Sequence, residues 1–125
     1  MNLVDSSVWL AYLAGEDAAD QFAEPLSAID QLLVPAIVVY EVVKVVLRER
    51  GEEAALQVYA TMNRGRVVAV DGRLATATAR LSLQHGLPMA DSIILATARA
   101  HQATIWTQDA HFAALPEARY FSEQG

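Results

Sequence analysis

Cysteine is missing from this sequence of 125 residues, and its absence excludes three kinds of site. A disulfide scaffold, a thiolate metal site and a cysteine nucleophile all require it. Long apolar runs are also missing, because the longest, Leu32 to Tyr40, falls far short of the ~20 residues that cross a bilayer. No basic residue precedes Asp5, which interrupts the first apolar stretch, so we expect no secretory signal. These features predict a cytoplasmic protein with no membrane partner, folded as a single domain over residues 1–125.

Basic side chains are absent from residues 1–43, which carry seven acidic ones. Residues 44–80 have a formal charge of +3 and the remainder −2, so the whole chain stands at −6. A protein this acidic is predicted to bind nucleic acid poorly without specific contacts. Eight of its nine basic residues are nevertheless arginine, the side chain best suited to bidentate phosphate contacts. Net charge alone therefore does not determine whether the protein binds nucleic acid.

Short apolar runs alternate with longer helical patterns, and no repeat or linker divides the chain. This alternation predicts the α/β class, with a parallel sheet covered by helices. We expect strands at residues 2–5, 32–34, 66–70, 103–107 and 118–121. We expect helices at residues 6–14, 17–30, 35–50, 52–64, 73–85 and 89–101, and a short turn at 110–115.

The valine-rich segment from Ala36 to Leu47 could form a strand or a helix. Propensity alone favours a strand. Its length, Pro35 at a plausible first helical position and the Arg/Glu-rich finish before Gly51 favour a helix, which we predict.

Four acidic residues are expected at one edge of this sheet. In a right-handed βαβ unit, strand carboxyl ends and helix amino ends lie at the same edge, where ligands bind. Asp5 follows the first strand, Glu41 lies about two turns into a helix, Asp91 begins another helix, and Asp109 follows the fourth strand. Each aspartate alone could simply cap a helix. Together the four carboxylates would repel one another unless cations held them, and hard oxygen ligands suit Mg²⁺ or Mn²⁺.

The motifs around these acids carry a resemblance to a known family. They are VDSSVW at residues 4–9, Glu41 after Pro35, ADSI at 90–93 and TQDAHF at 107–112. In order and spacing the chain resembles the PIN-domain ribonucleases, and most closely the VapC-type toxins of toxin–antitoxin pairs. The resemblance covers nearly the whole chain and implies a single PIN-like domain over residues 1–125.

The resemblance implies a three-layer α/β/α sandwich with a central parallel sheet and its first strand innermost. It also implies a Mg²⁺- or Mn²⁺-dependent endoribonuclease with Asp5, Glu41, Asp91 and Asp109 as catalytic acids. The family's polar position beside the first acid falls on Ser6 or Ser7, and its threonine falls on Thr107. The chain departs from many relatives at His111, where they carry a further acid. The resemblance therefore allows either one or two bound metal ions.

The chemistry expected from this resemblance is hydrolysis of RNA phosphodiesters by metal-activated water. Asp5 and Asp91 would be the main ligands, with Glu41 and Asp109 binding through water or a second metal. Candidate contacts to RNA phosphates, which could equally be ordinary solvated surface, are Lys44, Arg48, Arg64 and Arg66. Toxins of this type pair with an antitoxin that covers the active-site groove, and they commonly form homodimers. The exposed face of residues 35–64 is a candidate docking surface.

Other classes fit the sequence less well. A phospho-receiver domain needs adjacent acids after the first strand and a lysine late in the sheet, but the only lysine is Lys44. An aspartyl-phosphate phosphatase would carry a second aspartate where Ser7 stands. A noncatalytic PIN-like interaction module remains an alternative, which metal-dependent RNA cleavage would separate from the enzyme. No pair of histidines has metal-ligand spacing, although His111 lies close enough to Asp109 to contact a phosphate or a water.

Overall fold

The computed structural model describes residues 1–15 and 17–122, and their strands form one parallel sheet. The strands are β1 (Asn2–Val4), β2 (Leu33–Pro35), β3 (Arg66–Val68), β4 (Thr104–Thr107) and β5 (Ala118–Tyr120). Their order is β3-β2-β1-β4-β5, so the first strand is central, as predicted. Leu3 of β1 pairs with Leu33 on one side and Ile105 on the other, which places these three residues at one level of the sheet.

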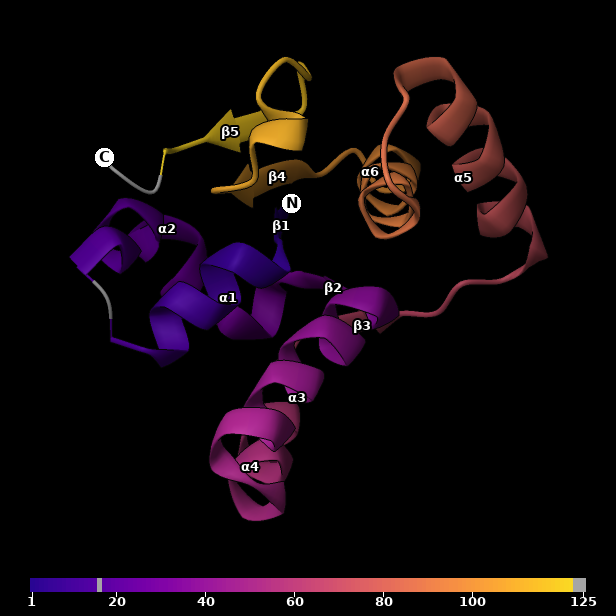
Figure 1. Cartoon of the computed structure of the whole chain (residues 1–125). Helices are drawn as coiled ribbons and strands as arrows, with labels where there is room; N and C mark the ends of the chain where they lie inside the picture. Colours follow the sequence, from indigo (N-terminus) through magenta and orange to yellow (C-terminus); the bar gives the residue numbers. More distant parts are fainter. Residues whose placement is uncertain (16, 123–125) are drawn as a thin grey trace.

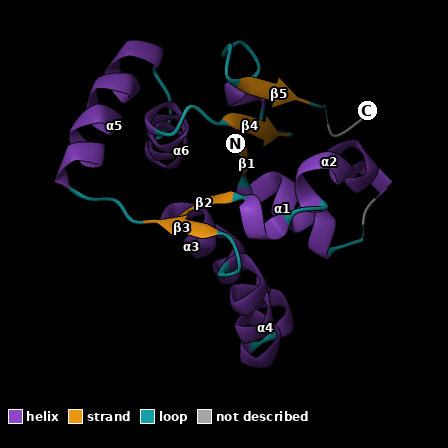
Figure 2. Cartoon of the chain, turned by 180° about the vertical axis from the view of Figure 1, so that it is seen from behind, coloured by secondary structure: helices purple, strands orange, loops and turns teal. Residues whose placement is uncertain are grey.

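Helices cover both faces of this sheet (Figure 1). On one side lie α1 (Ser6–Leu13) and α2 (Ala23–Leu26), and on the other lie α5 (Gly72–His85) and α6 (Met89–Ala100). The pair α3 (Ala36–Arg50) and α4 (Glu52–Met62) projects beyond the β3 edge, as the view from behind in Figure 2 also shows. The predicted three-layer α/β/α sandwich is therefore confirmed. Within the described part of the chain, no helix has the length and apolarity needed to cross a membrane.

The valine-rich segment is the helix α3, as its length predicted. Val38, Val42 and Val46 are buried at a spacing of four residues, which is one face of a helix. Gly51 ends this helix with φ 89°, a conformation that glycine adopts without steric cost. The same residue is the N-cap of α4, so the two helices form a hairpin without a longer connecting loop.

The single helix predicted over residues 17–30 is wrong. The segment contains the 3₁₀ turn η1 (Asp17–Phe22), the short helix α2 and a second 3₁₀ turn η2 (Ile29–Gln31). Pro25 explains the interruption, because proline has no N–H to bond the carbonyl of Gln21 and its ring clashes with that carbonyl. The strand expected at residues 66–70 also ends early, at Val68 on the sheet edge.

The core lies between the sheet and its two helical layers. Its largest fully buried side chains include Trp9 of α1, Phe22 beside α2, and Phe112 of the 3₁₀ turn η3 (Ala110–Phe112). The helix α6 is buried over every residue from Asp91 to Ala98, because it packs against the sheet, α3 and α5. An acidic residue in the first turn of that helix is therefore held by a rigid part of the fold.

Candidate active site

The four acids predicted to share one sheet edge do lie there. Asp5 follows β1 and caps α1, and Asp109 follows β4 and caps η3. Glu41 is in the second turn of α3, and Asp91 is in the first turn of α6. Burial is the main cause that raises the pKa of the other three carboxyls, and the charge of Asp109 raises each of them further, which indicates that the four acids lie close together. We call the space between them the acidic crevice.

Asp5 is the most enclosed of these acids, with 2% of its surface exposed. The Ser7 hydroxyl donates to Asp5 Oδ1 at 2.6 Å, and the Thr107 hydroxyl donates to Asp5 Oδ2 at 2.5 Å. Each hydroxyl also accepts a backbone N–H from the segment after β4: that of Gln108 reaches Ser7 at 3.0 Å, and that of Asp109 reaches Thr107 at 2.8 Å. Both oxygens of Asp5 are thus fixed in direction by groups from opposite ends of the chain.

Helix capping accounts for only one of the hydrogen bonds that Asp5 accepts. Its Oδ1 accepts the N–H of Val8 at 3.3 Å, as an N-cap does. A cap would need only that bond, whereas Asp5 also receives two hydroxyl hydrogen bonds while almost fully buried. Of the two serines considered from the sequence, Ser7 is the one bound to Asp5. Ser6 acts instead on Glu41, where it partly offsets the burial that raises the pKa of that carboxyl.

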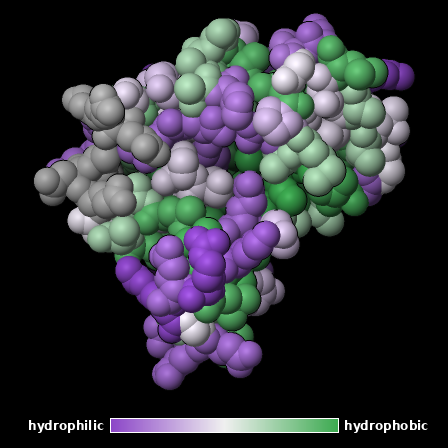
Figure 3. Space-filling model, in the orientation of Figure 1, coloured by the Kyte–Doolittle hydropathy of each residue, from purple (hydrophilic) through white to green (hydrophobic). Residues whose placement is uncertain are grey.

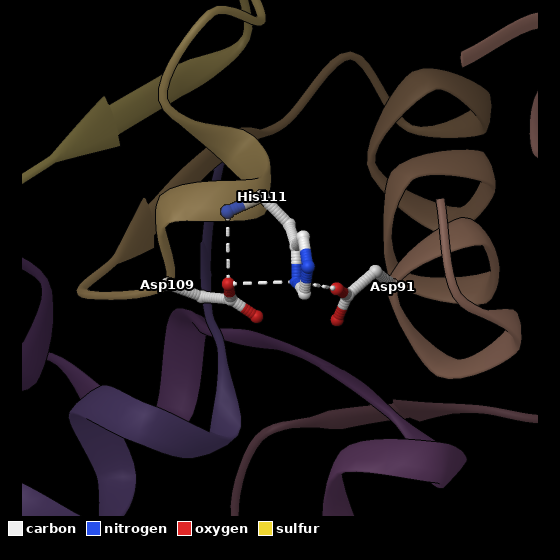
Figure 4. A group of neighbouring side chains, drawn as sticks. All are labelled: Asp91, Asp109 and His111. Atoms are coloured by element: carbon white, nitrogen blue, oxygen red, sulfur yellow. Dashed lines mark hydrogen bonds and ion pairs between the residues drawn. The ribbon is translucent and has the colours of Figure 1, made fainter. Parts of the chain in front are cut away.

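Asp91 and Asp109 meet across the crevice with His111 between them (Figure 4). His111 Nδ1 lies 3.0 Å from Asp91 Oδ2 and 3.1 Å from Asp109 Oδ1. The backbone N–H of His111 also donates to Asp109 Oδ1 at 2.9 Å. The sequence placed His111 near Asp109 but gave no sign that it also reaches Asp91, because that contact depends on how α6 packs beside η3.

Burial and mutual repulsion disfavour the ionised form of these acids. Burial is the main cause that raises the pKa of Asp5 to about 6, against the lowering effect of its hydrogen bonds from Ser7 and Thr107. At Asp91, burial and then the charge of Asp109 raise the pKa to about 6. Burial likewise raises the pKa of Glu41. Three carboxyls are thus held in an environment with too little positive charge to compensate for them.

The donor set fits a hard divalent cation. Glu41 Oε1 is buried without a hydrogen-bond partner within the described residues, which is costly unless something binds it. Carboxylate oxygens are the ligands that Mg²⁺ and Mn²⁺ prefer. Asp91, Asp109 and His111 also bring one ligand atom each within 4.8 Å of one another. A cation at this crevice would bind the unpaired oxygen and relieve the repulsion.

The four basic residues proposed to bind phosphate lie in two separate places in the structure. Lys44 and Arg48 follow Glu41 along α3, where Lys44 Nζ lies 3.3 Å from the Tyr40 hydroxyl. Arg64 instead bonds Asp30 at 2.9 Å, just before the amino end of β2. Arg66 begins β3 and pairs with Leu33, the first residue of β2. Arg64 and Arg66 therefore lie at the amino ends of the strands, whereas the acids lie at the carboxyl ends.

Comparisons with known proteins agree with this fold. The sequence model of the PIN domain family matches residues 3–118. A toxin–antitoxin complex from Klebsiella pneumoniae contains a chain with a TM-score of 0.84 and 21% identity, with 98% of this chain and 99% of that one covered. No sequence among the curated proteins matches significantly.

Two further solved structures show the same fold at low identity. VapC20 from Mycobacterium tuberculosis, described as a toxin that cleaves the sarcin–ricin loop, gives a TM-score of 0.77 at 20% identity, covering 93% of this chain and 95% of its own. FitAcB from Neisseria gonorrhoeae gives 0.75 at 23% identity, with 97% of each chain covered. At these identities the likeness establishes the fold alone.

Proposed function

Because the chain belongs to the PIN domain family, we propose that it is an endoribonuclease that depends on Mg²⁺ or Mn²⁺ and acts as the toxin of a toxin–antitoxin pair. The observation that supports this proposal most strongly is the convergence of Asp5, Glu41, Asp91 and Asp109 on one crevice. Mutually repelling carboxylates destabilise a fold unless they hold a cation, so their joint placement is better explained by function than by separate helix-capping roles.

Asp5 and Asp91 would be the main metal ligands, and Glu41 and Asp109 would complete the site. The bound metal would acidify a water and neutralise charge that develops on the phosphate. The protein's own part is to hold the ligands in place. Ser7 and Thr107 fix the direction of both Asp5 oxygens, so that Asp5 keeps one orientation during the reaction. Orienting partners of this kind commonly affect metal affinity or activity about 10- to 100-fold.

RNA would reach this crevice past α3. Lys44 and Arg48 lie on the same helix as Glu41, and we propose them as the phosphate contacts. Two bound divalent ions would change the formal charge of the protein from −6 to −2, which lessens its repulsion of a polyanion. Arg64 and Arg66 are left out of this proposal because of their position at the far edge.

We test the activity with structured RNA, the purified protein, and an Asp91→Asn variant as the matched control. Cleavage by the parent in Mg²⁺ or Mn²⁺, lost with EDTA and in Asp91→Asn, is the expected result. Undiminished cleavage in EDTA would exclude the mechanism. Binding of RNA without cleavage in either metal would favour a noncatalytic PIN-like module.

The antitoxin is proposed to dock on the α3–α4 hairpin. A groove of about 350 Å³ there is lined largely by apolar side chains, among them Tyr40, Leu47, Leu56 and Tyr59. Leu56 is 69% exposed, although it is strongly apolar. We expect expression of the protein to arrest growth, and co-expression of a small protein encoded beside it to restore growth. Leu56→Asp should weaken that rescue and leave RNA cleavage unchanged.

A homodimer is also proposed. Figure 3 shows hydrophobic surface over the region of α5 and α6, where Met89 is 71% exposed and Val70 is 43% exposed. Exposed apolar patches of this kind mark contact sites between proteins. Sedimentation of the parent should give the mass of a dimer, and Met89→Asp should shift the protein towards the monomer. A parent that sediments as a monomer would contradict this assignment.

A further inference from the structure

His111 occupies the mouth of the acidic crevice. It is the middle residue of η3, and its side chain is 58% exposed. Its Nδ1 nevertheless points inward, between Asp91 Oδ2 at 3.0 Å and Asp109 Oδ1 at 3.1 Å (Figure 4). The imidazole is therefore part of the acid cluster, and its exposed edge faces solvent.

Local structure determines this orientation. Asp109 caps η3 by accepting the backbone N–H of His111, which places the histidine directly beside the carboxylate. Asp91 approaches from α6, whose residues are buried from Asp91 to Ala98. Neither of the other two histidines belongs to the group of ligand atoms found among the described residues. His101 follows the opposite end of α6, where its Nδ1 bonds Thr97 O at 3.0 Å, and His85 is the last residue of α5.

The spacing of these atoms suits coordination of a six-coordinate ion. Adjacent ligands on an octahedral ion with bonds of about 2.1 Å lie about 3.0 Å apart. The two distances from His111 Nδ1 match that separation, and the three ligand atoms lie within 4.8 Å of one another. Glu41 Oε1, buried without a partner among the described residues, independently indicates that the crevice binds a further group. A metal could thus bind to both carboxylates and the ring nitrogen without rearrangement of η3.

We propose that His111 Nδ1 is a direct ligand of a metal ion bound by Asp91 and Asp109, and that it makes this site prefer Mn²⁺ over Mg²⁺, an inference that rests on the proposed metal-dependent function. Mg²⁺ binds oxygen ligands and keeps several waters, whereas imidazole nitrogen favours transition metals. Mn²⁺ accepts carboxylate oxygen and imidazole nitrogen together. An acid at this position would instead give an all-oxygen site that holds Mg²⁺ comparatively well.

The deciding experiment detects nitrogen bound to Mn²⁺ by pulsed electron paramagnetic resonance, which does not depend on activity. Mn²⁺ bound to the parent should show modulation from a coordinated ¹⁴N nucleus. His111→Asn should still bind Mn²⁺ through the acids but lose that modulation. His85→Asn, which removes an exposed histidine away from the crevice, should keep it. Bound Mn²⁺ without nitrogen modulation in the parent, or modulation that persists in His111→Asn, would overturn the assignment.

Calorimetric titration provides the second measurement. His111→Asn should weaken Mn²⁺ binding about tenfold or more and change Mg²⁺ binding much less. His111→Asp should strengthen Mg²⁺ binding and so reduce the preference for Mn²⁺. An unchanged ratio of the two affinities in both variants would contradict the proposal. Failure of the parent to bind either ion would overturn the proposed metal-dependent function as well, whereas Mn²⁺ bound by oxygen alone would overturn only the role of His111.

Discussion

Thr107 joins two of the candidate metal ligands through a single hydroxyl, which donates to Asp5 Oδ2 at 2.5 Å and accepts the N–H of Asp109 at 2.8 Å. The two acids follow neighbouring strands, β1 and β4, but stand at opposite ends of the sequence. One fully buried side chain therefore fixes the positions of both.

Thr107→Val tests this coupling because it keeps the shape of the side chain and removes the hydroxyl. We expect a loss of about 1–3 kcal/mol in the free energy of unfolding, since the N–H of Asp109 is left without its partner. Cleavage should fall about 10- to 100-fold, because Asp5 and Asp109 are no longer oriented together. Thr76→Val removes an exposed hydroxyl that bonds only its own helix and serves as the control. Equal activity of Thr107→Val and the parent would contradict a positioning role.

The stability of the metal-free protein should fall as the pH rises from about 4 to above 6. Burial raises the pKa of Asp5 and Asp91 to about 6 from 3.8, so the native state resists ionisation while the unfolded chain ionises freely. The stabilisation is complete below the unfolded pKa and is lost as the pH passes the native pKa. For Asp5 the loss should be on the order of 2–3 kcal/mol. Urea unfolding in EDTA at pH 4.5 and at pH 7 measures this loss in the free energy of unfolding. The same measurement on Asp5→Asn gives the part of the loss that comes from groups other than Asp5.

Asp5→Asn should abolish cleavage yet leave the metal-free protein at least as stable as the parent at neutral pH. The change removes a buried charge while keeping the shape and an oxygen that can cap α1. Mg²⁺ or Mn²⁺ at a hundred times its dissociation constant should stabilise the parent by roughly 2.7 kcal/mol, and the variant much less at the same concentration. Thermal unfolding with and without metal, beside a cleavage assay, gives both answers. Full activity together with an unchanged metal response would show that Asp5 is only a cap.

Lys44→Ala and Arg48→Ala should weaken RNA binding, and each should reduce the slope of its salt dependence by about one if the side chain neutralises one phosphate. Arg64→Ala is the matched control, because Arg64 pairs with Asp30 at the other edge of the sheet. Binding measured over a series of salt concentrations distinguishes the variants, while metal binding should be unchanged in all three. A loss of RNA affinity in Arg64→Ala alone would contradict the proposed path and would place the RNA at the amino ends of the strands instead.

The alternation of apolar runs and helical patterns was sufficient to predict a parallel sheet covered by helices, whereas the three layers and the central first strand were implied by the family resemblance. The length of the valine-rich segment, Pro35 and the charged finish before Gly51 predicted the helix α3, and the burial of its valines along one face agrees with that prediction. The same reasoning failed where one residue breaks a pattern, as Pro25 does in the segment predicted to be a single helix. Helix patterns report which side chains are apolar, and they do not count the backbone hydrogen bonds that a proline removes.

For the candidate site, the sequence predicted which acids share an edge, because parallel strands all end there. It did not predict the contacts that depend on side-chain direction. The bridge from His111 to Asp91 requires η3 to lie beside the first turn of α6, which no local pattern encodes. The exclusion of Arg64 and Arg66 likewise follows from strand register, since Arg66 pairs with the first residue of β2.

The central position of β1 has a consequence for biosynthesis. Its two neighbours in the sheet are β2, which follows soon in the chain, and β4, which starts at Thr104. Long-range pairing of parallel strands is slow, and a ribosome releases the amino end first. Asp5 therefore emerges early, but Thr107, Asp109 and His111 follow only after α6 has been made. A nascent or truncated chain that ends before β4 lacks Thr107, Asp109 and His111, so any activity of this protein begins only after β4 and η3 have been made.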